Sequence, residues 1–334
     1  MLKAAIVGCG GIAQVHGKVL QDFDGAELVA CADIIPERAE KLAATYGGKA
    51  YTSLEEMLEN EDVDVLHICT PHYLHTPMMK YAVEKGLKVF CEKPPAMTFE
   101  QWDEFKTAAK DKDVAICFQN RYNQSVQHIK KLIDSGVTGA IKGIRAFVTW
   151  SRGESYYVDS GWRGSLKTEG GGVLINQSIH TLDLMIYLAG AAKWADASCC
   201  NHHLKGVIEV EDMMEALINF GDFSGLFYAT TAYSTDSPVM VEFSCENCFI
   251  RMEEKELTVR WNNGKTEHFC FDESENGVGK SYWGSGHHAC ISDFYNHISA
   301  GKKAPINPDN CDVSIRTMLS MYKSARETHD KVNI

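Results

Sequence analysis

The sequence predicts a doubly wound α/β domain followed by an α+β domain with an antiparallel sheet. Short apolar runs alternate with helical stretches up to about residue 120, a glycine turn follows the first run, and strand-like segments succeed one another later in the chain. The chain has 334 residues, which allows two domains of ~150 residues each. We therefore expect one domain over residues 1–120 and a second over residues 121–334.

The expected strands of the first domain are continuous apolar runs, as in parallel strands that are covered on both faces. They are residues 4–7, 28–32, 63–69, 87–91 and 114–118. The helical stretches between them run from the glycine turn through residue 20, then over residues 37–46, 77–85 and 99–109. This alternation is typical of a doubly wound fold with right-handed crossovers.

The pattern changes in the second domain. A helix at residues 126–133 and a long strand at 141–150 precede a loop rich in glycine, serine, tyrosine and arginine at 151–172, and an apolar helix at 174–189 follows. The next strands are expected at residues 213–220, 224–232, 239–245, 249–252 and 256–261, and closing helices at 288–299 and 314–329. Strand directly after strand indicates an antiparallel sheet.

Composition excludes several classes of protein. The charge sum is 33 − 45 = −12, which argues against a nucleic-acid partner, because phosphate binding depends on Lys and Arg. There is no run of about 18 apolar residues that would span a membrane. The short apolar start runs straight into a glycine turn, so we expect no signal peptide. The twelve scattered cysteines are then expected to be reduced, in the cytoplasm.

The most specific local motif is Gly8-Cys9-Gly10-Gly11-Ile12-Ala13, between a predicted strand and a predicted helix. In this Gly-x-Gly-x-x-Ala pattern the first glycine makes the turn, the second lets the backbone approach a pyrophosphate, and the small last residue permits close helix–strand packing. A chance glycine cluster is the alternative. However, Asp33 ends the second strand 33 − 13 = 20 residues past Ala13, where a carboxylate accepts ribose hydroxyls. We therefore predict an NAD-binding Rossmann domain.

Asp33 also favours NAD over NADP as the cofactor, because its carboxylate would repel a 2′-phosphate. The next residues, Ile34-Ile35-Pro36, supply no cation. Arg38 lies further on, where a capping or solvent-facing role competes with contact to the cofactor.

Two polar motifs follow strands of the predicted parallel sheet. Glu92-Lys93-Pro94 comes after residues 87–91, and Thr70-Pro71 comes after residues 63–69. Ligands of open α/β sheets bind at the carboxyl ends of the strands. For Glu-Lys-Pro alone, a surface turn is the competing interpretation.

A third motif is the triple glycine at residues 170–172 with the helix that follows it. Glycines let a backbone approach a neighbour closely. The helix has a core-facing stripe of Ile175, Ile179, Leu182, Ile186 and Ala189, and beside it a polar stripe of Asn176, His180, Asp183 and Tyr187. The polar stripe fits the wall of a cleft, although it could simply face water. We expect Asp183 to orient the helix rather than to react.

Together these motifs resemble the glucose–fructose oxidoreductase/inositol dehydrogenase (Gfo/Idh/MocA) family over essentially the whole chain. Further marks of the resemblance are Asn120-Arg121-Tyr122, Trp162-Arg163-Gly164, His180 with Asp183, and Gly286-His287. The resemblance implies that the second domain has a large, mostly antiparallel open sheet, one face of which forms a dimer contact. We therefore expect a homodimer or homotetramer, and pyranoside or cyclitol substrates.

The resemblance also implies that Lys93 and His180 are catalytic and that Glu92 touches the nicotinamide-side ribose. Oxidising a secondary alcohol requires hydride transfer to the cofactor and removal of the hydroxyl proton. Lysine can act as the base or stabilise the oxyanion, and histidine carries protons at neutral pH. Family members often have Asp in place of Asn176 and Asn in place of His72. The first departure leaves open whether Lys93 or His180 is the base.

The candidate residues form two sets. The cofactor-binding set is Gly8, Gly10, Gly11, Ile12, Ala13, Asp33, Arg38, Thr70, Pro71, His75, Glu92 and Lys93. The substrate-binding set is Lys93, Arg121, Tyr122, Tyr157, Trp162, Arg163, Asn176, His180 and His287. Several of these have plain alternatives, since Trp162 could be core, His75 could be a loop residue, and His287 could cap a helix.

We expect no metal site. The runs Cys199-Cys200-Asn201-His202-His203 and Cys245-x-x-Cys248 suggest zinc, which needs three or four converging ligands. Successive residues of a strand point to opposite faces, so the first run does not converge. A single Cys-x-x-Cys without a second pair is a weak signal.

Three functions remain open on the sequence. The favoured one is an NAD-dependent dehydrogenase or reductase acting on the secondary hydroxyl of a sugar, glycoside or cyclitol. The second is a glycosidase that oxidises, eliminates, adds water and reduces with tightly bound NAD. The third is a non-catalytic nucleotide-sensing regulator, which the presence of both Lys93 and His180 disfavours.

Overall fold

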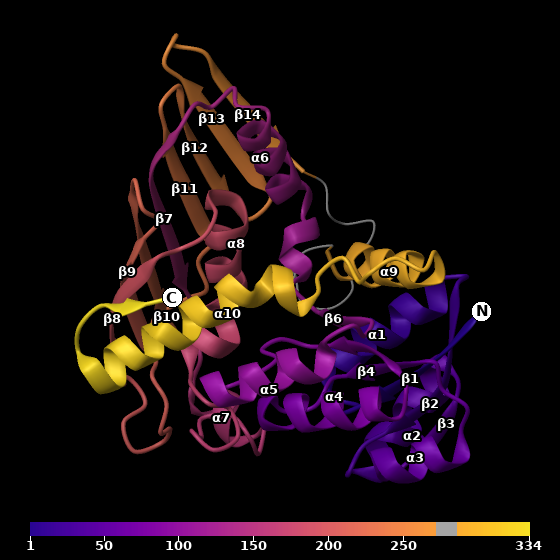
Figure 1. The fold of residues 1–334 in the computed structure, drawn as a ribbon. Coiled ribbons are helices and arrows are strands. Elements are labelled where there is room, and N and C mark those ends of the chain that lie inside the picture. Colours follow the sequence, from indigo (N-terminus) through magenta and orange to yellow (C-terminus); the bar gives the residue numbers. More distant parts are fainter. Residues whose placement is uncertain (272–285) are drawn as a thin grey trace. The chain divides into compact units, whose positions relative to one another are not determined.

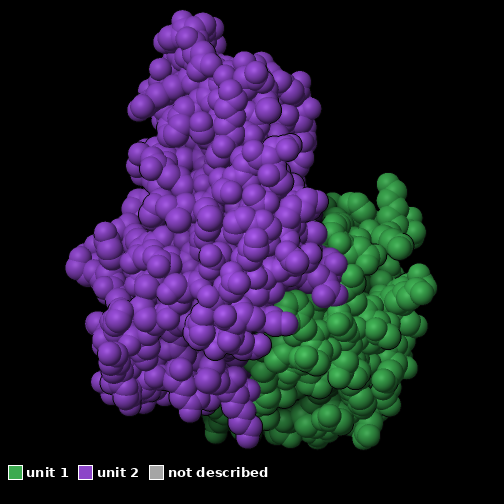
Figure 2. All heavy atoms as spheres, turned by 60° about the vertical axis from the view of Figure 1, so that its left-hand side comes forward, with its two compact units in different colours: residues 1–119, 276–311 green, residues 120–275, 312–334 purple. Residues whose placement is uncertain are grey.

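The computed structural model describes residues 1–271 and 286–334. The described residues form two compact units, residues 1–119 with 286–311, and residues 120–271 with 312–334 (Figure 2). The chain leaves the first unit near residue 120 and returns to it in helix α9 (Gly286–Ser299). The sequence did not indicate this return, because an amphipathic pattern does not tell which core a helix joins.

Helix α9 joins the first unit through two buried aromatic residues. The Phe294 ring lies 5.3 Å from the Phe90 ring, and the Tyr295 ring lies 5.6 Å from the Phe23 ring. Both α9 residues are fully buried. Burying two large aromatic side chains stabilises this attachment by several kcal/mol, on the order of 1.5–3 kcal/mol each.

The described part of the first unit contains a six-stranded parallel sheet in the order β3-β2-β1-β4-β5-β6 (Figure 1). Its strands are β1 (Leu2–Val7), β2 (Ala26–Ala32), β3 (Lys49–Tyr51), β4 (Val65–Ile68), β5 (Lys88–Cys91) and β6 (Val114–Ile116). The predicted α/β fold is confirmed. The chain turns from one side of β1 to the other between β3 and β4, so the carboxyl ends of β1 and β4 form a topological switch point.

Helices connect these strands. They are α1 (Gly11–Asp22), α2 (Pro36–Tyr46), α3 (Leu54–Asn60), α4 (His75–Glu84), α5 (Phe99–Ala109) and the 3₁₀ turn η1 (His72–Leu74). Ser53 and Thr98 begin α3 and α5, since each side chain accepts a hydrogen bond from a first-turn amide. Strand β3 and helix α3 were not predicted, because a three-residue edge strand has no apolar run to reveal it.

The described part of the second unit contains a nine-stranded sheet in the order β14-β13-β12-β11-β7-β10-β9-β8-β15 (Figure 1). Its strands are β7 (Ile141–Thr149), β8 (Trp194–Cys200), β9 (Met213–Asn219), β10 (Ser224–Thr230), β11 (Met240–Cys245), β12 (Cys248–Glu253), β13 (Glu256–Trp261), β14 (Thr266–Cys270) and β15 (Val332–Asn333). Strands β7 and β10 pair in parallel and the other neighbours pair antiparallel. The predicted large, mostly antiparallel sheet is confirmed.

One face of this sheet is covered and part of the other is open. Burial alternates along β9 and β10, as expected for a sheet with one buried face. Helix α8 (Ile179–Ala189) lies against β7. The remaining helical segments are η2 (Gln119–Tyr122), α6 (Gln124–Asp134), α7 (Glu154–Val158), the π-helical turns η3 (Val173–Ser178) and η5 (Ser324–Thr328), and α10 (Pro308–Lys323). The single helix predicted for residues 174–189 is thus a π-helical turn that continues as α8.

Candidate active site

The glycine turn after β1 has the backbone that the fingerprint requires. Gly8 has φ +84°, and a Cβ there would lie 2.7 Å from the backbone of Cys69 and Thr70. Only glycine fits this close approach of the ends of β1 and β4. Helix α1 then starts at Gly11, after Gly10, with no side-chain cap. A Cβ on Gly10 or Gly11 would meet nothing within 4 Å, so the first-turn amides fit a pyrophosphate.

Asp33 lies where β2 ends and is held by two backbone amides. Cys9 N donates to its Oδ2 at 2.7 Å, and Ile35 N donates to its Oδ1 at 2.9 Å. The carboxylate is half-buried, and each oxygen retains a lone pair for a ribose hydroxyl. Asp33 therefore fits the adenosine ribose of a dinucleotide. Arg38, in the first turn of α2, is exposed.

His75 joins the two polar motifs that were predicted at the sheet edge. Its Nδ1 lies 2.7 Å from the carbonyl oxygen of Pro94, and its Nε2 lies 2.7 Å from that of Thr70. Burial lowers the pKa of His75, while both carbonyls favour the protonated ring. The lowered pKa favours the neutral ring, whose single N–H donates to one of the two carbonyls while both lie within hydrogen-bond distance. His75 thus ties the loop after β4 to the loop after β5.

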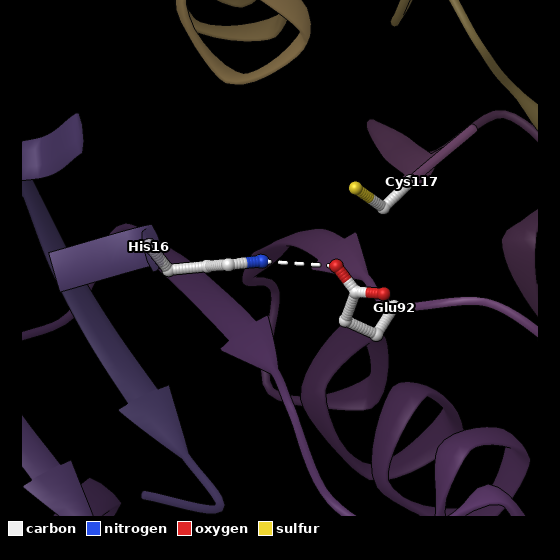
Figure 3. A group of neighbouring side chains, drawn as sticks. All are labelled: His16, Glu92 and Cys117. Carbon is white, nitrogen blue, oxygen red and sulfur yellow. Dashed lines mark hydrogen bonds and ion pairs between the residues drawn. The ribbon is translucent and has the colours of Figure 1, made fainter. Parts of the chain in front are cut away.

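Glu92 belongs to a buried chain of side chains that the sequence did not reveal. Its Oε1 lies 3.0 Å from His16 Nε2, and the Nδ1 atoms of His16 and His67 are 2.9 Å apart. His67 Nε2 lies 2.8 Å from the Tyr295 hydroxyl. Cys117 lies beside the His16–Glu92 pair, and the ligand atoms of these three residues are within 4.8 Å of one another (Figure 3). His16 lies on the buried face of α1, where a sequence pattern shows only a core position.

The charges in this cluster are set by opposing effects. Burial lowers the pKa of His16, but hydrogen bonds with Cys117 and Glu92 outweigh it and raise the pKa to about 9. Burial raises the pKa of Glu92, but the His16 hydrogen bond and charge hold it well below its usual range. Burial lowers the pKa of His287 to about 4. Lys93, directly after Glu92, is half-buried.

In the second unit, the triple glycine packs closely against the protein itself. A Cβ on Gly171 would lie 2.0 Å from the Tyr322 hydroxyl, and one on Gly172 would lie 1.9 Å from the Glu211 carbonyl oxygen. The buried Glu211 carboxylate accepts hydrogen bonds from Gly172 N at 3.0 Å and Leu174 N at 3.2 Å. The close approach predicted from the glycines therefore serves to anchor η3.

The polar stripe of the following helix is partly accessible. Asn176, His180 and Tyr187 are half-buried, whereas their neighbours on η3 and α8 are almost all buried. Asp183 is fully buried and forms an ion pair with Arg121, whose Nε and Nη2 lie 2.8 and 2.6 Å from its oxygens. Arg121, which was predicted to bind substrate, thus anchors η2 to α8.

Glu169 is a buried carboxyl that sequence analysis missed. Asn176 Nδ2 donates to its Oε1 and Gly164 N donates to its Oε2, each at 2.5 Å. Burial raises the pKa of Glu169 to about 7, against the lowering effect of these hydrogen bonds. A carboxyl that titrates near neutral pH beside a candidate site residue is a common mark of functional sites. No local pattern distinguishes Glu169 from a surface glutamate.

The loop of residues 151–172, before η3, has half-buried and buried aromatic residues. The Arg163 guanidinium lies over the rings of Tyr156, at 4.5 Å, and Trp162, at 4.9 Å, and Trp162 and Arg163 are half-buried. Tyr157 is 1% exposed and packs with Leu204, so it belongs to a small hydrophobic core rather than to the surface. Tyr122 is half-buried in η2, and His287 is buried in the first unit.

The chain matches two family models. A model described as "Oxidoreductase family, NAD-binding Rossmann fold" matches residues 2–120, and the GFO/IDH/MocA C-terminal domain matches residues 126–251. The protein belongs to the Gfo/Idh/MocA family. The family expected from the motifs is therefore confirmed.

Several relatives in the Gfo/Idh/MocA family act on sugars according to their names. D-glucoside 3-dehydrogenase of Escherichia coli is 35% identical over 57% of this chain and 54% of its own length. The 2,7-anhydro-N-acetylneuraminate hydratase of Mediterraneibacter gnavus is 26% identical over 81% of this chain and 72% of its own. The WlbA dehydrogenase of Bordetella pertussis, solved with NADH and UDP-GlcNAcA, is 25% identical with a TM-score of 0.86, covering 100% of this chain and 98% of that one.

The chain spans about half the length of several curated relatives that it matches. In the solved WlbA dehydrogenase the likeness extends over both units of this Gfo/Idh/MocA protein. Within residues 1–271 and 286–334, no helix is both long and apolar enough to cross a membrane.

Proposed function

We propose that the protein is an NAD-dependent oxidoreductase that transfers a hydride between nicotinamide and a secondary hydroxyl of a sugar, glycoside or cyclitol. One observation supports this most strongly. The glycine turn, Asp33 and the Glu92-Lys93 pair all follow strands of one parallel sheet, at the edge where such sheets bind dinucleotides. Membership of an oxidoreductase family whose members include sugar dehydrogenases agrees with it.

The first unit is proposed to bind NAD, which supplies the hydride acceptor or donor. The amides at the start of α1 would hold the pyrophosphate, Asp33 the adenosine ribose and Glu92 the nicotinamide-side ribose. NAD is preferred over NADP in this proposal because the Asp33 carboxylate repels a 2′-phosphate. The full proposed set is Gly8, Gly10, Gly11, Ile12, Ala13, Asp33, Arg38, Thr70, Pro71, His75, Glu92 and Lys93, with His75 acting through the two loops that it joins.

Lys93 and His180 are the proposed catalytic residues. Lys93 follows Glu92 at the sheet edge and would remove the hydroxyl proton or stabilise the oxyanion. His180 would accept or relay that proton, as an accessible histidine on an otherwise buried helix. Proton transfer of this kind contributes ~10²–10⁴ to a rate.

The second unit is proposed to bind the carbohydrate. A guanidinium close to two aromatic rings, as Arg163 is to those of Tyr156 and Trp162, offers forked donors beside aromatic surface to a sugar. Arg121 and Tyr157 would contribute by holding η2 and the loop of residues 151–172 in place. The full proposed set is Lys93, Arg121, Tyr122, Tyr157, Trp162, Arg163, Asn176, His180 and His287.

The direct test is a screen of sugars, glycosides and cyclitols with NAD and with NADP, followed at the nicotinamide absorbance. The proposal expects NADH formation with at least one secondary alcohol, and its loss in Lys93→Met. If no compound reduces NAD and no ketone oxidises NADH, although calorimetry shows that the protein binds NAD, the dehydrogenase assignment is wrong.

A redox-neutral reaction is the second candidate, because the hydratase relative covers 81% of this chain. Such an enzyme would oxidise its substrate, eliminate a group from it, add water and reduce the product again, while NAD stays bound throughout. This is the cycle of the glycosidase alternative. Product analysis by chromatography distinguishes the two candidates. A glycoside consumed with catalytic NAD and no NADH accumulation favours the redox-neutral reaction.

We also propose that the protein is a homodimer or homotetramer, joined through the open face of the second sheet. Leu217 on β9 and Leu226 on β10 are paired across the two strands and are 44% and 46% exposed. This exposed apolar pair supports an interaction surface on that face. Light scattering should show an oligomer that Leu226→Glu dissociates, and a monomeric wild type would contradict this. A cytoplasmic location is part of the same proposal.

A further inference from the structure

His16 lies at the centre of a buried chain that links three parts of the first unit. The chain runs from Glu92, after β5, through His16 on α1 and His67 on β4 to Tyr295 on α9. All four residues are buried. The rings of His67 and Tyr295 are stacked at 5.8 Å, which further limits their motion. Each ring nitrogen of both histidines thus has a partner at hydrogen-bond distance.

We propose that His16 is a positioning residue which, as an imidazolium, holds Glu92 ionised and fixed directly before Lys93. This deepens the proposed function and rests on it, because Glu92 and Lys93 are its proposed cofactor and catalytic residues. His67 and Tyr295 hold the His16 ring in turn.

The charge of Glu92 determines how the protons are distributed among these four side chains. In one arrangement both rings are neutral, with the Tyr295 hydroxyl donating to His67, His67 to His16 and His16 to the Glu92 carboxylate. That arrangement would leave a buried carboxylate opposite a neutral ring, which is costly. With His16 charged, Nε2–H donates to Glu92 and Nδ1–H donates to His67, whose Nε2–H donates to Tyr295. Each N–H of the two rings then has an acceptor, and the buried charges of His16 and Glu92 cancel.

The groups around the pair agree with this assignment. Glu92 faces His16, His287 and Lys93, and the thiols of Cys69, Cys91 and Cys117 lie within reach of its charge. Burial raises the pKa of all three thiols well above the usual value, so they are neutral. Burial and then the His16 charge lower the pKa of His67, which is therefore also neutral. His16 is thus the buried cation in direct contact with Glu92.

The trio of His16, Glu92 and Cys117 also contains metal-ligand types, but its geometry fits a shared proton better. Ligand atoms ~2.1 Å from a tetrahedral zinc are about 3.4 Å apart. His16 Nε2 and Glu92 Oε1 are 3.0 Å apart, which is a hydrogen-bond distance.

The first experiment measures the charge of His16 directly. In protein with ¹⁵N-labelled histidine, imidazole nitrogen chemical shifts separate imidazolium from the neutral ring. His16→Gln assigns the signal. The proposal expects one ring to stay doubly protonated up to about pH 8, since the pKa is raised to about 9. A neutral His16 ring at about pH 7 would overturn it.

The second experiment measures the effect on Glu92. In His16→Gln the amide can still donate to Glu92 but carries no charge, so burial should raise the pKa of Glu92 toward neutral. NAD affinity should then fall by up to tenfold per pH unit on the acidic side of about pH 7, where the NAD affinity of wild type stays constant, and kcat/KM should fall more steeply than in wild type. At every pH, Glu92→Gln should have the NAD affinity that His16→Gln shows at low pH.

Cys117→Ser is the comparison variant, because it changes the third member of the trio and leaves the His16–Glu92 ion pair in place. Its pH profile should lie closer to wild type than that of His16→Gln does, and elemental analysis of the purified protein should find no stoichiometric metal. A profile of His16→Gln that superimposes on wild type would overturn the proposal, as would a bound metal lost equally in His16→Gln and Cys117→Ser. Absence of any turnover would count against the proposed function alone, since the ring signal and NAD titration still report on His16.

Discussion

Replacing Glu169 by Gln should remove a pH dependence of stability that originates in one buried carboxyl. The ordinary pKa of 4.5 applies in the unfolded chain, and burial raises it to about 7 in the folded protein. The folded state therefore binds more protons between these two values. Stability falls as pH rises from about 4.5 to about 7, and the loss is complete above that.

The magnitude follows from the shift of about 2.5 units between 4.5 and about 7. At 1.36 kcal/mol per unit, the ionised carboxyl costs about 3 kcal/mol in the free energy of unfolding at about pH 8. Gln cannot ionise, and it can keep both contacts. Its oxygen can accept from Gly164 N, and its amide can donate to Asn176 once the Asn176 amide has turned.

Urea unfolding of both proteins at about pH 5 and about pH 8 measures this effect. The difference in unfolding free energy between Glu169→Gln and wild type should change by about 3 kcal/mol in favour of the variant at the higher pH. Other titrating groups, His16 included, are common to both proteins and cancel in the difference. If the two stabilities change in parallel with pH, Glu169 does not titrate in this range.

Three further predictions concern the proposed reaction. NAD should bind about thirtyfold more tightly than NADP, a difference of ~2 kcal/mol, because Asp33 repels a 2′-phosphate; equal affinities in calorimetry would contradict this. Lys93→Met should leave Tm nearly unchanged and lower turnover by ~10²–10⁴, and normal turnover would favour the interpretation of Glu92-Lys93-Pro94 as a surface turn. Asn176→Asp places a second carboxyl beside Glu169. If His180 is the proton acceptor, the acidic limb of the kcat/KM profile should then move to higher pH. His180→Ala should abolish that limb together with most of the activity. An unmoved limb together with an active His180→Ala would exclude His180 from that role.

The local sequence pattern was sufficient to predict the parallel sheet and the glycine turn of the first unit. The apolar runs at β1, β4 and β5 are parallel strands, and the positive φ of Gly8 is the turn that its motif predicts. These features depend on residues near one another in sequence. They were therefore visible without knowledge of the fold.

The features that were missed depend on contacts between distant segments. His16 and His67 lie 51 residues apart, and His67 and Tyr295 lie 228 apart. A histidine on a buried helix face gives no sign of its partner, so the chain from Glu92 to Tyr295 was not predictable. The same holds for α9, whose attachment depends on Phe294 meeting Phe90. Such pairings follow only from the tertiary structure.

Asn176 shows how a sequence comparison and a structure complement each other. The resemblance indicated that a carboxylate common in the family is replaced here by a neutral amide beside His180. The structure places a carboxyl next to that amide, from Glu169, seven residues earlier in the chain. The Glu169 carboxyl has a pKa of about 7, so the charge beside Asn176 changes within the neutral range. A carboxyl that titrates there makes the local charge depend on pH, which a partly exposed aspartate with an ordinary pKa would not do.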